Sequence, residues 1–374
     1  MDFELNEEES AVSELAGQII GDMSGSQNPE QLTSGYDEKL WRELAKANLL
    51  GISIEEPYGG SGLGYLATCA ILQEVGRNGA QVPVLASIVM GAMPIGTFGG
   101  DILKSEILPK VIAGELILTC GLLEYDSTTS CPSARANKTA SGWTVSGTKA
   151  CVPFGMAAHY ALVPACDEFG GVGIFVVNLS AKGVKRYPQL NTAGQVEAKI
   201  ELTGVEVDSN FVLGDPTGDP GRGTEIISWI QERAVTGICM LQAGVTSEAL
   251  RLTSEYAKTR EQFDRPIGSF QAVAQRCADA YIDAEAIRLT ALQAAWRIDA
   301  GMDSTKAVSI AKFWAAEAGQ RVLAAAQHIH GGVGVDRDYP LHKYFLAAKV
   351  NELTLGGAQE HLSCLGDALA QEPV

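Results

Sequence analysis

Two segments of the sequence combine residue types that can hold a phosphate group. Residues 260–268 (REQFDRPIG) follow a long helical pattern and place two guanidinium groups beside a proline turn. A guanidinium forms paired, charge-assisted hydrogen bonds with phosphate oxygens, so this segment suits a pyrophosphate dianion. Residues 327–334 (QHIHGGVG) offer glycine amides that can approach a phosphate or a ribose closely. Taken singly, each segment is more simply a solvated helix end or a helix stop.

The sequence lacks the signatures of several other kinds of site. It has no G-x-G-x-x-G between a strand and a helix and no Walker-type loop, so the two common phosphate-binding folds are not supported. Its five histidines form no H-E-x-x-H pattern, its eight cysteines contain no C-x-x-C pair, and no G-x-S-x-G elbow is present. We therefore expect no metal site, no serine-hydrolase chemistry, and mostly buried, reduced thiols.

Charge and hydropathy exclude some partners. The formal net charge is -17 and the pI is near 4.7, which argues against nucleic acid, because binding to phosphate backbones needs clustered Lys and Arg. No apolar run approaches the ~20 residues of a membrane helix, and the start of the chain lacks the basic and apolar regions of a signal peptide. We expect no membrane partner and a cytoplasmic location.

The order of elements predicts an α+β fold. Residues 1–115 have helical patterns, residues 116–215 have short β-type runs, and residues 216–374 have long helical patterns. Asn6 before three glutamates and Asp37 before an amphipathic run predict two N-caps. Both helical parts are expected to contribute to one bundle around an inserted β domain.

Apolar residues at helical spacing predict which helix faces are buried. Val12, Leu15 and Ile19 lie on one face of the first helix. A later stripe consists of Ile282, Ala286, Leu289 and Trp296. These stripes are expected to face the bundle core.

The two phosphate-suited segments occur in order, about sixty residues apart, within this helix, β, helix arrangement, and together they resemble the acyl-CoA dehydrogenase family. Further similarity lies in the glycine-rich loop at 56–62 and the β-type segment at 142–149. The resemblance implies an N-terminal helical domain (1–115), a middle β-barrel or sandwich domain (116–215) and a C-terminal four-helix bundle (216–374).

The resemblance also implies FAD as cofactor, bound across a subunit interface. In the family, the arginine of an R-x-x-F segment and a Q-x-x-G-G-x-G turn of one subunit contact the diphosphate and adenosine of the neighbour's flavin. Carried over to this sequence, the cofactor-binding residues are Arg260, Phe263, Gln327, Gly331 and Gly332. The physical chemistry agrees, since a guanidinium binds phosphate and a glycine turn admits close backbone approach.

Three segments depart from the family pattern. Where members usually have a Thr-Glu-Pro-x-x-Gly-Ser-Asp type loop beneath the flavin, residues 122–129 are LLEYDSTT. Where a Trp/Phe-x-Thr/Ser segment flanks the isoalloxazine, residues 152–156 are VPFGM. The frequent Tyr-Glu-Gly-Thr segment, whose glutamate is the base in many members, is replaced by LGGA at 355–358, and Gly356 cannot remove a proton. The chain's own flavin cradle is therefore expected to be degraded.

The remaining candidate for the catalytic base is Glu232. Some relatives place the base on the long helix that leads to the R-x-x-F segment, and Glu232 lies near that position. An ungapped count back from Gly244 puts Ala234 there, so a small shift is needed. The alternative role of Glu232 is that of a solvated carboxylate beside Arg233.

The resemblance implies an FAD-dependent acyl-CoA dehydrogenase subunit that desaturates a CoA thioester and passes electrons to an electron-transfer flavoprotein. A half-intact site indicates assembly with a related dehydrogenase subunit, and assembly of the chain with itself stays open. Residues 250–271 and 340–344 resemble an actinobacterial branch whose paired subunits act on steroid side-chain CoA thioesters. Two alternatives stay open: a non-catalytic structural partner subunit, and a flavin oxidase or monooxygenase on the same scaffold.

Overall fold

The computed structural model describes residues 3–24, 35–219 and 221–371, which divide into two compact units. The bundle unit consists of residues 3–24, 65–80 and 235–371, and the sheet unit consists of residues 35–64, 81–219 and 221–234. Each unit therefore draws on the N-terminal helical part of the chain. The predicted domain boundaries at 115 and 215 stay a prediction.

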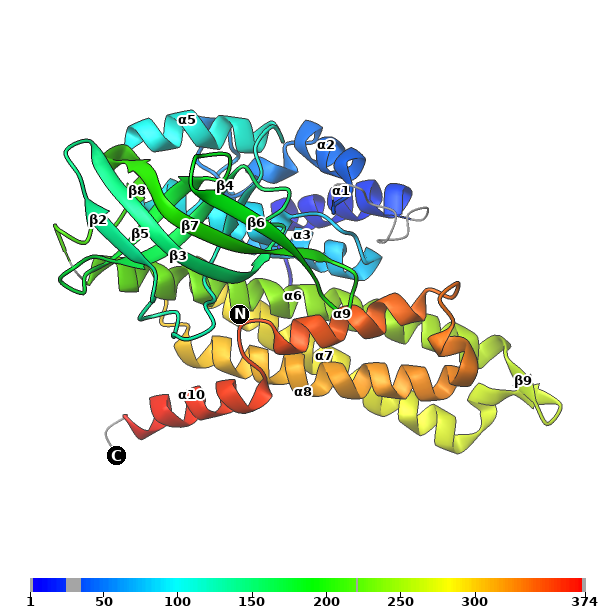
Figure 1. Ribbon diagram of the computed structural model, residues 1–374. Coiled ribbons are helices and arrows are strands. Elements are labelled where there is room, and N and C mark those ends of the chain that lie inside the picture. The colour runs from blue at the N-terminus through cyan, green and yellow to red at the C-terminus, as the bar shows by residue number, and fades with distance from the viewer. Residues whose placement is uncertain (1–2, 25–34, 220, 372–374) are drawn as a thin grey trace. The chain divides into compact units, whose positions relative to one another are not determined.

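The N-terminal part is helical, as its caps and periodicity predict (Figure 1). Asn6 and Glu9 exchange hydrogen bonds of 2.8 and 2.9 Å, which caps the first helix reciprocally. The Asp37 carboxylate accepts from the amides of Lys39 and Leu40, both at 3.0 Å, so both predicted caps are confirmed. The helices are α1 (Glu7–Ser24), α2 (Glu38–Lys46), α3 (Tyr65–Asn78), the π-helix Val84–Ala92, α4 (Met93–Phe98) and α5 (Asp101–Ile112).

The middle part is an eight-stranded sheet in the order β6-β7-β3-β2-β4-β5-β8, with β1 paired to β4. The strands are β1 (Leu118–Cys120), β2 (Arg135–Lys138), β3 (Gly142–Pro153), β4 (Tyr160–Cys166), β5 (Val172–Asn178), β6 (Val184–Leu190), β7 (Val196–Asp208) and β8 (Val212–Leu213). Trp143 and Phe175 pack edge to face inside it, with ring centroids 5.3 Å apart. The predicted β domain between two helical parts is thus confirmed.

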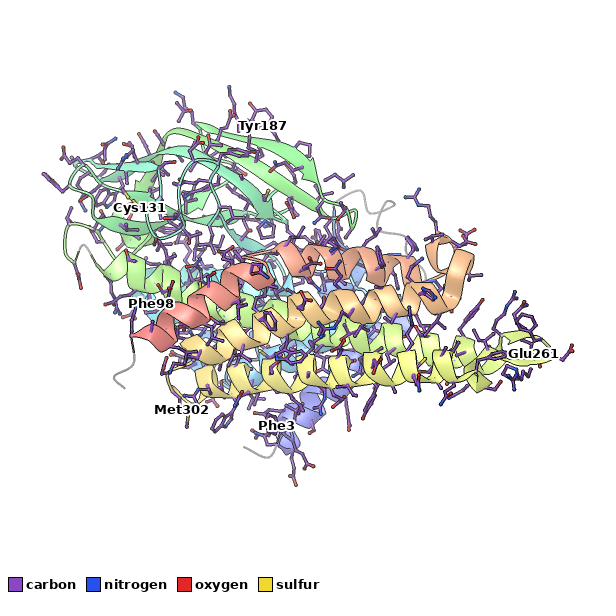
Figure 2. The ribbon with its side chains drawn as sticks, turned by 90° about the horizontal axis from the view of Figure 1, so that it is seen from below. Phe3, Phe98, Cys131, Tyr187, Glu261 and Met302 are labelled. Atoms are coloured by element: carbon purple, nitrogen blue, oxygen red, sulfur yellow. The ribbon has the colours of Figure 1, made fainter. Side chains whose placement is uncertain are left out.

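The C-terminal part is a helical bundle. Its helices are α6 (Arg222–Thr259), α7 (Gln271–Asp299), α8 (Thr305–His330), α9 (Leu341–Leu353) and α10 (Ala358–Ala370). One core cluster takes buried residues from α6, α7, α8 and α9, and small alanines such as Ala249, Ala284 and Ala326 let these helices approach closely. Figures 1 and 2 both show α7 and α8 side by side.

The predicted apolar stripes are partly wrong. Leu15 is 42% exposed and Ile282 is 63% exposed. The buried positions are Val12, Ala16 and Ile20 on α1, and Ala280, Ala284, Ile287 and Ala291 on α7. A search for large apolar side chains misses faces built from alanine, because close helix packing selects small residues rather than strongly hydrophobic ones.

We expect Asp37→Ala to lower the free energy of unfolding of the sheet unit by about 1 kcal/mol, because the first amides of α2 lose their acceptor. The measurement is urea denaturation followed by circular dichroism. Glu38→Ala is the control, since it leaves the cap in place and removes an exposed ion pair with Arg42 and one first-turn charge, so we expect a smaller loss of stability than for Asp37→Ala. Equal effects of the two substitutions would contradict the capping role.

Candidate functional site

The segment after α6 is a tight hairpin. β9 (Glu261–Gln262) pairs with β10 (Arg265–Pro266), and the two residues between them, Phe263 and Asp264, have φ values of 55° and 61°. Two successive positive φ angles define the turn that matches the twist of a two-residue hairpin, but they strain residues other than glycine. Phe263 is 86% exposed, and Figure 2 shows the hairpin that begins at Glu261 projecting beyond the helix ends.

Arg260 stands at the base of this hairpin. Its amide donates to Tyr256 O at 2.8 Å, and its carbonyl accepts from the Ile267 amide at 2.8 Å, so the backbone is fixed on both sides. Its side chain is exposed. The guanidinium is therefore presented on a rigid backbone and is open to a ligand or a partner.

The glycine turn follows α8. Gly331 ends the helix with a φ of 61°, a positive value that glycine adopts more readily than other residues. A Cβ atom built on Gly331 or Gly332 would meet nothing within 4 Å, so the backbone there borders open space. This leaves room for a phosphate or a ribose to approach these amides, and binding by Gly331 and Gly332 stays a prediction.

One pocket of about 380 Å³ brings the hairpin and the end of α8 together. Its lining consists of Gln262, Phe263, Ile267, Phe270, Ala272, Val273, Arg276, His328 and Ile329. Arg265 lies 4.1 Å from the centroid of the Phe270 ring, which keeps a second cation beside the pocket. Two aromatic rings beside cationic groups suit an adenine ring joined to phosphates.

His328, rather than Gln327, faces this pocket. Gln327 is half-buried, and its Nε2 atom is buried without a hydrogen-bond partner among the described residues. His328 is exposed and lines the pocket. The spacing of Q-x-x-G-G before Gly331 points to position 328, so counting back from the glycines could have found His328. The role of Gln327 stays a prediction.

A buried ring stack fixes the end of α8. His330 stacks on Tyr256 of α6 with ring centroids 4.4 Å apart, and its ring nitrogens lie 2.8 Å from Ala326 O and 3.0 Å from the Tyr339 hydroxyl. Burial lowers the pKa of His330, which favours the neutral ring. The glycine turn therefore starts from a rigid, uncharged anchor.

The turn between α9 and α10 carries no carboxylate at Leu355 or Gly356, whose φ values are 55° and 97°. The fully buried Lys312 of α8 donates to Asn351 O at 2.6 Å and Glu352 O at 3.0 Å, at the end of α9. Burial lowers the pKa of Lys312 to about 8. Carbonyl groups at a helix C-terminus stabilise a cation there, so this lysine anchors the turn.

Glu232 lies on α6 in the sheet unit and is half-buried. The guanidinium of the next residue, Arg233, lies 3.6 Å from the centroid of the Trp229 ring and donates to Trp229 O at 3.3 Å. The α9–α10 turn, the other candidate position for a base, belongs to the bundle unit. Catalysis by Glu232 stays a prediction.

The loop at 122–134 is built around a buried ion pair. Glu124 accepts from Lys149 Nζ at 2.5 Å, and also from the Ser127 and Ser133 hydroxyls at 2.5 and 2.6 Å. Burial acts to raise the pKa of Glu124, but these hydrogen bonds outweigh it and lower the pKa to about 2. All these donors are internal, so the carboxylate holds the loop rather than a ligand.

The segment after β3 is also held internally. Cys151 and Phe154 have positive φ values of 48° and 52°, and Arg186 donates to three carbonyl groups, those of Gly155, Met156 and Ala158. Pro153, which precedes Phe154, has neither an amide N–H nor a hydroxyl to donate. The chain therefore fits FAD unequally: its bundle unit suits the adenosine end, whereas residues 152–156 lack hydroxyl donors for the flavin ring.

Two other kinds of feature are absent from the part of the chain that the structure describes. None of its helices combines the length and the apolar character needed to cross a membrane. No cluster of three or more His, Cys, Asp or Glu side chains there could hold a metal ion.

Comparisons with known proteins agree with this geometry. Two family models match, "Acyl-CoA dehydrogenase, N-terminal domain" at residues 7–115 and "Acyl-CoA dehydrogenase, C-terminal domain" at residues 221–370. The acyl-CoA dehydrogenase FadE27 of Mycobacterium tuberculosis is 38% identical, and the match covers 100% of both chains. Members of this family are FAD-dependent oxidoreductases.

Two similar solved structures are named for pairs of proteins. A chain of the ChsE4-ChsE5 complex from Mycobacterium tuberculosis is 38% identical, with a TM-score of 0.92 and 100% of both chains covered. A chain of a variant of the Tcur3481-Tcur3483 steroid ACAD is 39% identical, with a TM-score of 0.90, covering 98% of this chain and 99% of that one.

We expect Lys149→Met to lower the free energy of unfolding by about 3–5 kcal/mol, because it leaves Glu124 buried without its cation. Urea denaturation followed by circular dichroism measures the change. Lys199→Met is the matched control on the same sheet, since the pair of Lys199 with Glu201 is open to solvent and screened by it, so we expect a much smaller loss of stability. Similar losses in both variants would show that the buried pair does not hold the loop.

Proposed function

Because the chain belongs to the acyl-CoA dehydrogenase family, we propose that it is one subunit of a mixed assembly that introduces an α,β double bond into a CoA thioester. In this assembly the chain supplies the adenosine end of an FAD site, and a related dehydrogenase subunit supplies the flavin cradle. The chain is thus an oxidoreductase subunit that acts only with its partner.

The observation that carries this proposal is the exposed hairpin at Phe263. The Phe263 side chain is 86% exposed on a strained turn, and its edge-to-face contact with Phe270, with ring centroids 6.1 Å apart, leaves most of the ring uncovered. Together with the pocket beneath it, the hairpin forms one half of a nucleotide site that needs a second surface to close it. Similar structures that pair two proteins, ChsE4 with ChsE5 and Tcur3481 with Tcur3483, support a partner of the same family.

The catalytic base is assigned to the partner subunit. Removal of the α-proton needs a desolvated carboxylate, and Gly356 provides none at the turn where many relatives carry it. When bound, FAD accepts the β-hydrogen as a hydride. The residues of this chain then act by orientation: Arg260 holds the diphosphate, and the amides of Gly331 and Gly332 border the ribose or phosphate.

The substrate, the electron acceptor and the location follow from resemblance. A steroid side-chain CoA thioester is supported by the similarity to the Tcur3481-Tcur3483 steroid ACAD. Electron transfer to an electron-transfer flavoprotein and a cytoplasmic location stay predictions. A flavin oxidase or monooxygenase on this scaffold would consume oxygen, whereas the proposed enzyme reduces a dye acceptor and consumes none.

A self-sufficient homo-oligomer is the second candidate, and the position of Glu232 favours it. This carboxylate lies half-buried on α6, on the helix where some relatives carry the base. In that case the same chain would supply both the hairpin and the flavin cradle.

The flavin content of the purified protein decides between these two assemblies. We expect the chain to be colourless alone and to contain about one FAD per two chains when co-expressed with its partner, because only mixed pairs complete a site. Arg260→Gln in the co-expressed complex is expected to release FAD, whereas Arg297→Gln, on the far end of α7, is not. About one FAD per chain in the protein alone would contradict the proposal.

Glu232→Gln separates the two positions of the base. In the co-expressed complex we expect acyl-CoA-dependent dye reduction to stay within about twofold of the unsubstituted rate, because the base lies in the partner. A loss of about 10²-fold or more, with FAD content unchanged, would assign general-base catalysis to Glu232 instead.

A further inference from the structure

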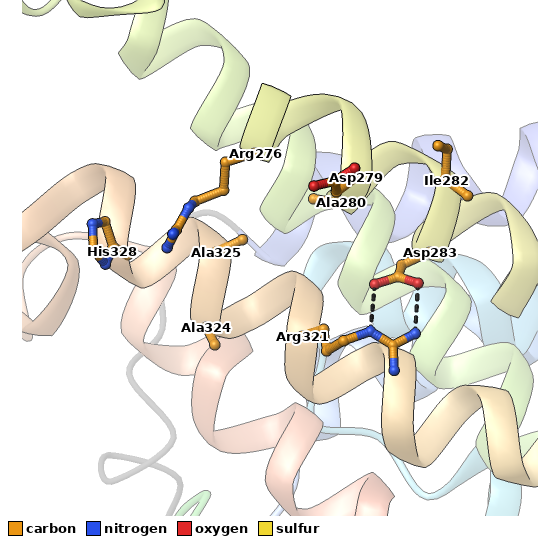
Figure 3. Close-up of a pocket in the computed structure, with 9 residues that line it drawn as sticks. All are labelled: Arg276, Asp279, Ala280, Ile282, Asp283, Arg321, Ala324, Ala325 and His328. Carbon is orange, nitrogen blue, oxygen red and sulfur yellow. Dashed lines mark hydrogen bonds and ion pairs between the residues drawn. The ribbon is translucent and has the colours of Figure 1, made fainter. Parts of the chain in front are cut away.

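The pocket beneath the hairpin continues into a larger groove. The groove has a volume of about 660 Å³ and runs between α7 and α8 (Figure 3). Among the described residues, Arg276 of α7 and His328 of α8 alone line both the pocket and the groove. They therefore mark the junction at which a ligand in the pocket would reach the groove.

Arg276 differs from the other arginine of the groove. Arg321 forms a two-point ion pair with Asp283, at 2.8 and 2.6 Å, and its charge is balanced. Within the described residues, the side chain of Arg276 forms no hydrogen bond or ion pair. Figure 3 shows it extending from α7 towards His328 on α8. Asp279 also lines the groove but does not line the pocket. Its carboxylate therefore does not neutralise the charge of Arg276 where Arg276 faces the pocket.

The rest of the pocket lining suits a ligand that joins an aromatic ring to an anionic group. Apart from Arg276, His328 and Gln262, its lining side chains are apolar. Phe263 and Phe270 present aromatic rings with centroids 6.1 Å apart. An adenine ring fits against such surfaces, and a phosphate group attached to it would lie within reach of a cation at the edge. Exposed charges contribute little in water, but closure by a partner subunit would desolvate this one and strengthen the interaction.

We propose that Arg276, assisted by His328, binds a phosphate of the adenosine diphosphate half of FAD. This rests on the proposed function and adds a specificity residue outside both the R-x-x-F segment and the glycine turn. Arg276 selects a ligand that carries phosphate next to the adenosine, and so it discriminates ADP-type ligands from adenosine itself. A guanidinium suits this role because it offers several donors to phosphate oxygens.

The test uses the co-expressed complex after removal of FAD. FAD is titrated back and followed by flavin fluorescence, and ADP and adenosine are used as competitors. We expect Arg276→Gln to weaken FAD and ADP binding about tenfold while adenosine binding stays within about twofold, because one charge-assisted contact is lost. Arg276→Lys is expected to restore part of the affinity, and His328→Ala to weaken FAD binding less than Arg276→Gln does.

Arg288→Gln is the matched control, since Arg288 lies on the same helix, pairs with Glu285 and does not line this pocket. Complex yield on gel filtration and the thermal midpoint check that every variant folds and assembles. If Arg276→Gln binds FAD as the control does while Arg260→Gln loses it, the role of Arg276 is refuted and the proposed function stands. If Arg260→Gln also keeps FAD, the proposed function itself fails.

Discussion

The exposed aromatic ring of Phe263 is the constraint around which the candidate site is organised. Water around an apolar ring is unfavourable, and the left-handed turn beneath it adds strain, so the hairpin is a stable feature only where something compensates for both. Arg260 and Ile267 fix its base through backbone hydrogen bonds. Within the chain this makes the hairpin rigid but leaves its tip uncovered, which is the arrangement expected of a surface that a partner and a nucleotide complete.

Rigidity elsewhere comes from two buried lysines, each held in a different way. Lys149 of the sheet unit faces a carboxylate, Glu124, and that pair would be costly to break. Lys312 of the bundle unit donates to carbonyl groups at the end of α9, and burial lowers its pKa. Both lysines fix segments that carry flavin-side or catalytic groups in relatives. The loop at 122–134 and the α9–α10 turn are thus firmly anchored in this chain, although the turn lacks the carboxylate that many relatives carry at the position of Gly356.

The fold could be predicted from the sequence because its determinants are local or shared with a family. The caps at Asn6 and Asp37 are short-range chemistry, and the two phosphate-suited segments, taken with the order of elements, led to the acyl-CoA dehydrogenase fold. The buried faces were harder, since alanine carries little hydrophobic signal. Arg276 could not be found at all, because an arginine within a helix has no pattern that reveals whether a neighbouring helix balances its charge.

The proposed assembly has a physical reason to keep the adenosine half of the site in this chain and to leave the base to its partner. A shared nucleotide site needs the hairpin, the glycine turn and the pocket in each chain that contacts a neighbour's cofactor, whereas a base is needed only once per active site. A chain that always pairs with a catalytic relative can therefore replace its carboxylate by Gly356 without loss to the assembly. In the proposed assembly, loss of the hairpin would be different, because the partner's cofactor would then lack the adenosine contacts assigned to this chain.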